Sequence, residues 1–172
     1  MRIVSLFSGA GGLDLGFRQA GHRIVWANDL YEDAVATYRR NIGNHVVCAD
    51  ITKVKSEDIP DCDMVIGGFP CQGFSVANTK RNTRDSRNVL YRELLRVIRD
   101  KRPVFFLAEN VKGILYFDGG RAFRRILADF ESVGYRVAYR LFNAADFGVP
   151  QRRERVIIVG TRQDVDYDFS YP

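Results

Sequence analysis

A cysteine stands in a rigid frame within the stretch Gly67-Gly68-Phe69-Pro70-Cys71-Gln72-Gly73-Phe74-Ser75. Pro70 fixes its own φ and lacks a backbone donor, while the glycines permit conformations that other residues resist. The apolar run at 64–66 just before this stretch indicates a buried strand. The layout therefore predicts that Cys71 is a nucleophile, held on a loop at the end of that strand, rather than an inert core thiol.

Three further side chains suit chemistry beside such a nucleophile. Glu109 follows the apolar run at 105–108, so we expect it to be partly desolvated and to act as a proton donor. Arg153 and Arg155 would share one face of a strand, because strand side chains alternate. Two guanidiniums there could hold Glu109, a base oxygen or a phosphate. The alternatives are a structural carboxylate and a charged strand edge.

A second constellation suits a nucleoside cofactor. The segment Phe7-Ser8-Gly9-Ala10-Gly11-Gly12 lies between a predicted strand and helix, where a ligand can approach the backbone. Asp29 follows Gly9 by 20 positions and could accept hydrogen bonds from ribose hydroxyls, while Asp50 could reach an adenine amino group. The glycines alone also fit a plain tight turn. Asp14 occupies the last position of the nicotinamide fingerprint, which favours S-adenosylmethionine over a dinucleotide.

The elements that would position these residues alternate along the chain. We expect strands at 2–7, 23–27, 46–48, 63–66, 104–108, 135–142 and 155–160, and helices at 13–20, 31–41, 89–99 and 121–132. This alternation predicts an α/β fold with a mostly parallel sheet and helices on both faces. Ligands bind beyond the carboxyl ends of such strands, so the residues from Phe7 to Gly12, Asp29, Asp50, Cys71 and Glu109 should converge on one edge.

Composition narrows the class of protein. The chain has 172 residues, 46% of them hydrophobic, which suits one globular domain. It lacks an apolar run long enough to span a membrane and a secretory signal at its start, so we expect a cytoplasmic protein. The net charge of +5 is weak evidence for nucleic acid, strengthened by clusters after Cys71 and around Arg153. We expect His22 and His45 to lie at the surface, outside the site.

Taken together, these motifs resemble those of the DNA (cytosine-5)-methyltransferases of bacterial restriction-modification systems. The matching segments occur in the family's order over almost the whole chain: Leu6-Phe7-Ser8-Gly9-Ala10-Gly11-Gly12-Leu13, Asn28-Asp29, Asp50-Ile51, Gly68-Phe69-Pro70-Cys71-Gln72-Gly73-Phe74-Ser75, Glu109-Asn110-Val111 and Gln151-Arg152-Arg153-Glu154-Arg155. The resemblance implies a Rossmann-like S-adenosylmethionine-dependent methyltransferase fold, with residues 1–172 forming a catalytic domain. It also implies a bacterial, nucleoid-associated enzyme.

The resemblance also implies a role for each matching residue. Cys71 would attack carbon 6 of a cytosine flipped out of duplex DNA, Glu109 would bond to nitrogen 3, and Arg153 and Arg155 would orient Glu109 and the base. The donor S-adenosylmethionine would be bound by Phe7, Gly9, Gly11, Leu13, Asp29, Leu30, Asp50 and Pro70. The loop after Cys71 would close over the base and meet DNA through Gln72, Ser75, Lys80, Arg81, Arg84 and Arg87.

Members of the family usually continue past the Gln-Arg-Arg-Glu-Arg segment. There they carry a target-recognition region and a terminal Gly-Asn segment that completes the cofactor site, and residues 164–172 show neither feature. The resemblance therefore implies a fold that is incomplete at its carboxyl end. We expect a fragment or one half of a split enzyme, which needs a second polypeptide or the missing segment for activity. The recognition sequence is not encoded in this part.

Three other readings remain open at this stage. A transfer RNA cytosine-5 methyltransferase would use the same chemistry, although that subfamily usually carries Pro-Pro-Cys and Phe-Thr where this chain has Phe69-Pro70-Cys71 and Phe74-Ser75. A non-catalytic subunit of a split methyltransferase would not need Cys71, Glu109 and Arg155 together. A nicotinamide oxidoreductase would leave the Pro-Cys frame unexplained.

Overall fold

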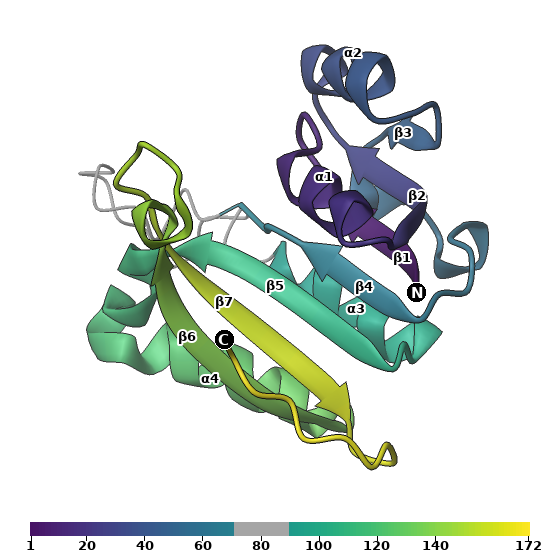
Figure 1. Cartoon of the computed structure of the whole chain (residues 1–172). Helices are drawn as coiled ribbons and strands as arrows, with labels where there is room; N and C mark the ends of the chain where they lie inside the picture. Colours follow the sequence, from purple (N-terminus) through teal and green to yellow (C-terminus); the bar gives the residue numbers. More distant parts are fainter. Residues whose placement is uncertain (71–89) are drawn as a thin grey trace.

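The computed structural model describes residues 1–70 and 90–172, and in this part seven strands form a single sheet (Figure 1). The strand order is β3-β2-β1-β4-β5-β7-β6. The strands are β1 (Arg2–Leu6), β2 (Arg23–Asp29), β3 (Val46–Cys48), β4 (Met64–Gly67), β5 (Phe105–Val111), β6 (Tyr135–Asn143) and β7 (Glu154–Arg162). The helices are α1 (Gly12–Gln19), α2 (Glu32–Asn41), α3 (Tyr91–Lys101) and α4 (Arg121–Ser132).

The sheet is mostly parallel, as the sequence predicted. β1 pairs in parallel with β2 and β4, and the parallel arrangement continues to β3 on one side and β5 on the other. β7 runs antiparallel to both β5 and β6. One edge of the sheet therefore gathers the carboxyl ends of β1 to β5 and the amino end of β7. The segment that precedes β7 reaches the predicted site for this reason.

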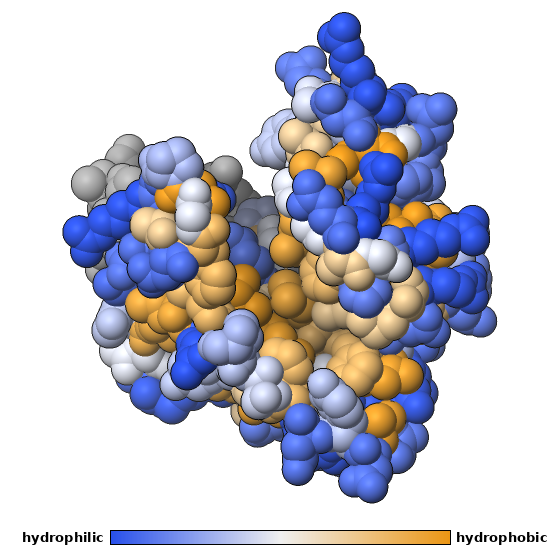
Figure 2. Space-filling view, viewed as in Figure 1, coloured by the Kyte–Doolittle hydropathy of each residue, from blue (hydrophilic) through white to orange (hydrophobic). Residues whose placement is uncertain are grey.

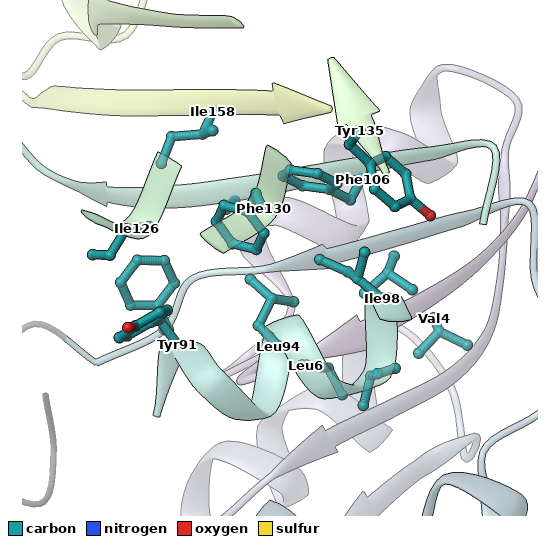
Figure 3. Packing of buried hydrophobic residues seen from close by; sticks show 14 of the residues in the cluster. Val4, Leu6, Tyr91, Leu94, Ile98, Phe106, Ile126, Phe130, Tyr135 and Ile158 are labelled. Atoms are coloured by element: carbon teal, nitrogen blue, oxygen red, sulfur yellow. The ribbon is translucent and has the colours of Figure 1, made fainter. Parts of the chain in front are cut away.

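Helices cover both faces of the sheet, which confirms the predicted layering. α1 and α2 pack on one face, where Val35 and Tyr38 join a cluster with Ile3, Ile24 and Ile66. α3 and α4 pack on the other face, and their apolar side chains meet those of β1, β4, β5 and β7 (Figure 3). The α3–α4 face holds the larger core. On the α1–α2 face, the part of the sheet beyond β4 lacks a described helix (Figure 1).

Local sequence explains the helix boundaries. In α3, buried residues recur at helical spacing, at Tyr91, Leu94, Val97 and Ile98. The helix ends at Lys101, and the next residue, Arg102, has a φ of +46° and precedes a proline. α4 begins after two glycines at positive φ and spans the residues that the sequence predicted. In the two described ranges, no helix combines the length and hydropathy needed to cross a lipid bilayer.

Candidate active site

A glycine loop links β1 to α1 at the carboxyl edge of the sheet. Gly9 and Gly11 have φ of +55° and +90°, a region that favours glycine. The loop is closed by hydrogen bonds from the backbone nitrogen of Gly11 to Ser8 O (3.0 Å) and from that of Ser8 to Asn28 O (2.9 Å). α1 follows directly, so its first backbone N–H groups point toward the same space.

Phe7, the first residue of this loop, adopts a φ of +53° without being glycine. Such a conformation costs on the order of 1 kcal/mol or more and persists only where the surroundings impose it. Phe7 lines two adjoining cavities, of about 390 Å³ and about 240 Å³. Phe7 is therefore the residue that the linings of both cavities share.

Asp29 ends β2 and holds the glycine loop. Its Oδ2 accepts a hydrogen bond from the Gly9 nitrogen at 2.7 Å, and its Oδ1 accepts one from the Tyr31 nitrogen at 3.0 Å. The side chain is buried, so these bonds replace lost contacts with water. The 20-residue spacing noted in the sequence thus corresponds to a direct contact between the two segments.

Asp50 follows β3 and caps a short turn, η1 (Ile51–Lys53). Its Oδ1 accepts hydrogen bonds from the nitrogen and the hydroxyl of Thr52, and these bonds lower the pKa of the carboxyl. Both aspartates line the smaller cavity. Its other lining residues are Phe7, Asn28, Leu30, Tyr31, Ala49, Ile51, Pro70 and Leu90.

Glu109 lies in the other cavity and is paired with an arginine. Arg155 Nε lies 2.7 Å from Glu109 Oε1, and the two side chains keep 25% and 26% of their exposure. The structure places Glu109 inside β5 rather than after it, on the face that also carries Leu107. The cavity is further lined by Ser5, Leu6, Phe7, Ser8, Gly12, Leu13, Asp14, Gly68 and Arg153.

The two arginines therefore differ in their relation to Glu109. Arg155 makes the ion pair from the second residue of β7, while Arg153 is exposed at the wall of the same cavity. The Arg153 backbone nitrogen is held by Asn143 Oδ1 at 3.0 Å. The structure brings both residues to the site, and Arg155 is the one in contact with the carboxylate.

The predicted nucleophile, Cys71, lies outside the described residues. So do the predicted DNA-binding residues Gln72, Ser75, Lys80, Arg81, Arg84 and Arg87. The start of their loop is described, however. The buried Asn110 side chain donates a hydrogen bond to Phe69 O at 3.1 Å, and Pro70 lines the smaller cavity. Because Asn110 adjoins Glu109, this bond ties the beginning of the loop to the strand that carries the acid.

Sequence reasoning missed several residues that shape this edge. Arg96 of α3 donates hydrogen bonds to the carbonyl oxygens of Ile51 and Val54, both at 3.1 Å, and to Ser56 Oγ at 2.7 Å. It therefore fixes the segment after Asp50. His45, which we expected at the surface, is half-buried and lies 3.0 Å from the Tyr38 hydroxyl. The spacing of these residues in the sequence carries no signal for such contacts.

Known proteins share this arrangement of strands and motifs. The family described as C-5 cytosine-specific DNA methylase matches residues 1–171. This chain belongs to that family. It is 49% identical over 99% of its length to the Type II methyltransferase M.NgoFVII of Neisseria gonorrhoeae, and covers 46% of that protein. It is 44% identical over 99% of its length to M.BspRI of Lysinibacillus sphaericus, again covering 46%.

Solved structures share the fold of this chain. A DNA modification methyltransferase encoded within a prophage (E. coli) superposes with a TM-score of 0.84 at 32% identity, over 99% of this chain and 49% of that one. The S. pombe Dnmt2 methyltransferase has the same fold, with a TM-score of 0.77 at 23% identity over 99% of this chain and 53% of that one. The fold is therefore the Rossmann-like fold of methyltransferases. The chain spans about half the length of the curated relatives it matches.

Proposed function

We propose that this chain supplies the catalytic part of a DNA (cytosine-5)-methyltransferase, with residues 1–172 as one catalytic domain. It would transfer a methyl group from S-adenosylmethionine to carbon 5 of a cytosine in duplex DNA. The observation that carries the proposal is the Glu109–Arg155 pair, 2.7 Å apart, whose glutamate lines a cavity that the glycine loop also lines. Family membership supports the reaction, and a DNA substrate would place the enzyme at the bacterial nucleoid.

The side chains around the glycine loop fit S-adenosylmethionine, which supplies an activated methyl group when bound. Each Asp29 oxygen accepts one backbone hydrogen bond and keeps a lone pair for a ribose hydroxyl. Asp50 Oδ2 has no bond to the described residues and could accept one from the adenine amino group. The proposed donor-binding residues are Phe7, Gly9, Gly11, Leu13, Asp29, Leu30, Asp50 and Pro70.

Cys71 would begin the reaction on the base. Its thiolate forms a bond to carbon 6 of a flipped-out cytosine, and the electron pair of the C5–C6 double bond moves into the ring. Glu109 supplies the proton that nitrogen 3 then carries, while Arg155 and Arg153 hold the carboxyl and the base. Carbon 5 takes the methyl group from the sulfonium of S-adenosylmethionine, whose sulfur keeps the bonding electron pair and leaves as the neutral thioether. Carbon 5 then gives its proton to solvent, the electron pair of that C–H bond restores the C5–C6 double bond, and the Cys71 sulfur leaves as a thiolate. The proton on nitrogen 3 returns to Glu109.

Residues of the loop after Cys71 would bind DNA. Four cations among them would neutralise backbone phosphates, and two polar side chains would contact the strand near the displaced base. These residues are Gln72, Ser75, Lys80, Arg81, Arg84 and Arg87. The charge of +5 on the whole chain agrees with a polyanionic substrate.

We further propose that activity requires a second polypeptide, or a carboxyl-terminal segment, that carries the target-recognition region. The length of the relatives supports this, and so does an apolar cavity of about 450 Å³ on the α1 side of the sheet. Its walls include Phe17, Phe105, Leu107, Ile157 and Val159, and Figure 2 shows the hydrophobic hollow between the two halves of the molecule. An apolar element from the missing part would cover it.

Transfer of a labelled methyl group tests the proposal. The chain is assayed on unmethylated duplex DNA and on transfer RNA, with and without the carboxyl-terminal half of M.NgoFVII. The proposal expects methylation of cytosine in DNA when both parts are present, and loss of this activity in Cys71→Ser. Labelling of transfer RNA alone would favour the RNA enzyme. Binding of DNA without methyl transfer under any condition would favour a non-catalytic subunit.

A further inference from the structure

A chain of buried polar side chains lies behind the glycine loop. Asp14 in the first turn of α1 is fully buried, although its position is glycine or alanine in the nicotinamide fingerprint. Its Oδ1 accepts a hydrogen bond from Ser5 Oγ at 2.7 Å, and its Oδ2 accepts one from the Tyr38 hydroxyl at 2.6 Å. The Tyr38 oxygen lies 3.0 Å from His45 Nε2. These hydrogen-bonded side chains thus connect β1, α1, α2 and the residue before β3.

Burying these linked polar side chains costs free energy of folding. Burial raises the pKa of the Asp14 carboxyl, and burial together with the neighbouring Asp14 raises the pKa of Tyr38. A carboxyl group in this position needs its hydrogen bonds to offset lost hydration, whereas apolar residues of similar volume would pack without that cost. What a fully bonded polar network adds is a defined geometry, because each partner fixes the direction of the next.

The geometry that is fixed here is that of the glycine loop. A Cβ placed on Gly11 would lie 2.7 Å from Ile42 Cγ1 and 2.9 Å from Tyr38 Cδ2, so the Tyr38 ring packs directly against the loop backbone. Tyr38 cannot shift without losing its bond to Asp14. Ser5 and Asp14 also line the cavity that holds Glu109, so these linked side chains form part of its wall beside the glycine loop.

We propose that Asp14 and Tyr38 are positioning residues for the methyl donor, which hold the Gly9–Gly12 loop in its binding shape through the Ser5–Asp14–Tyr38–His45 chain. This inference rests on the proposed function for the identity of the donor. The statement about the loop rests on the contacts alone. Removing the Tyr38 hydroxyl should therefore loosen the loop first and weaken donor binding as a consequence.

Two variants that each remove one buried hydroxyl form a matched pair. Tyr38→Phe keeps the ring against Gly11 but loses the bond to Asp14. Tyr135→Phe loses a comparable buried bond, from the Tyr135 hydroxyl to Pro103 O at 2.7 Å, at the opposite edge of the sheet. Asp14→Asn is a second test of the same chain, since it keeps the shape but removes one acceptor oxygen. Thermal unfolding checks that each variant folds.

Amide hydrogen exchange of the free chain gives the readout that does not depend on the donor. We expect Tyr38→Phe and Asp14→Asn to accelerate exchange at Gly9, Gly11 and Leu15, whose nitrogens are hydrogen-bonded in the loop, while Tyr135→Phe leaves these amides unchanged. Titration with S-adenosylmethionine should give a Kd raised about tenfold in the first two variants alone.

The outcomes separate the two proposals. If the unaltered chain, with the complementing half present, does not bind S-adenosylmethionine, the proposed function fails. If loop exchange in Tyr38→Phe matches that in Tyr135→Phe, the inference about the chain of side chains is overturned, whatever the donor affinity. Faster loop exchange with unchanged donor affinity would also overturn it, because the loop shape would then not govern binding.

Discussion

The Nε atom of Arg155 lies 2.7 Å from Oε1 of Glu109, across two antiparallel strands. Their register explains the contact: Arg155 stands opposite Val111, and Glu109 stands opposite Ile157. The two charged residues are therefore diagonal neighbours on one face of the sheet. That face is apolar further along both strands, at Leu107 and Val159, so the polar chemistry is confined to the carboxyl edge of β5.

Arg155→Ala should lower the rate of methyl transfer about a hundredfold, because Arg155 would no longer hold the Glu109 carboxyl in place while charge develops on the base. Arg153→Ala should have a smaller effect, since Arg153 lines the cavity without the ion pair. Single-turnover methyl transfer with the complementing half measures both. An equal decrease in the rate of methyl transfer in the two variants would show that the ion pair between Arg155 and Glu109 does not contribute to the reaction.

Asp29→Asn should raise the Kd for S-adenosylmethionine about tenfold or more. An asparagine offers one acceptor oxygen where Asp29 provides two, so one of the Gly9 and Tyr31 nitrogens would face an amide nitrogen. Isothermal titration measures the change, with Asp33→Asn on the exposed surface of α2 as the control for charge. An unaltered Kd in Asp29→Asn would remove Asp29 from the donor site.

Gly160→Ala should destabilise the fold by about 2 kcal/mol or more. A Cβ there would lie 1.9 Å from Cε1 of Phe106, which packs across β7 from the neighbouring strand. Gly16→Ala is the matched control, because nothing lies within 4 Å of its Cβ and alanine favours the helix. Urea denaturation compares the free energies of unfolding. A Gly160→Ala protein as stable as the control would contradict the packing of β5 on β7.

Cys62 should react slowly with iodoacetamide at pH 8. Burial raises its pKa to about 11, so its thiol stays protonated well above the range of a free cysteine. The rate should increase as the pH rises toward that value. Cys48, which is exposed, provides the internal comparison, and peptide mass spectrometry separates the two sites. Alkylation of Cys62 as fast as Cys48 at pH 8 would contradict the burial of Cys62.

Much of this architecture follows from local sequence. Runs of apolar and β-branched residues located all seven strands, and the buried parallel strands β1 and β4 stood out because they are continuously hydrophobic. β3 and α4 have the predicted bounds. The convergence of Phe7, Asp29, Asp50 and Glu109 followed from topology alone, since strand ends in a parallel sheet meet at one edge. The predicted strand before Glu109 ended too early because a charged residue interrupts the apolar run while the ladder with β7 continues to Val111.

The contacts between distant side chains could not be predicted in this way. Arg96 reaches Ile51 across 45 positions, and Tyr38 reaches Asp14 across 24. The first pair depends on how α3 packs beside the turn after β3, and the second on how α1 and α2 pack on the sheet. Neither Arg96 nor Tyr38 alters the hydrophobic pattern of its own helix in a way that names its partner. Asp14 was visible in the sequence only as a departure from a glycine fingerprint, and its bonds to Ser5 and Tyr38 appear only in the structure.

Covalent capture by a cytosine analogue tests the proposed attack of Cys71 on the base. Duplex DNA that contains 5-fluorocytosine in place of cytosine is mixed with the chain, the complementing half and S-adenosylmethionine, and the products are separated under denaturing conditions. We expect a DNA adduct on Cys71, dependent on the methyl donor and absent in Cys71→Ser. An adduct that persists in Cys71→Ser, or the absence of any adduct with all components present, would contradict it.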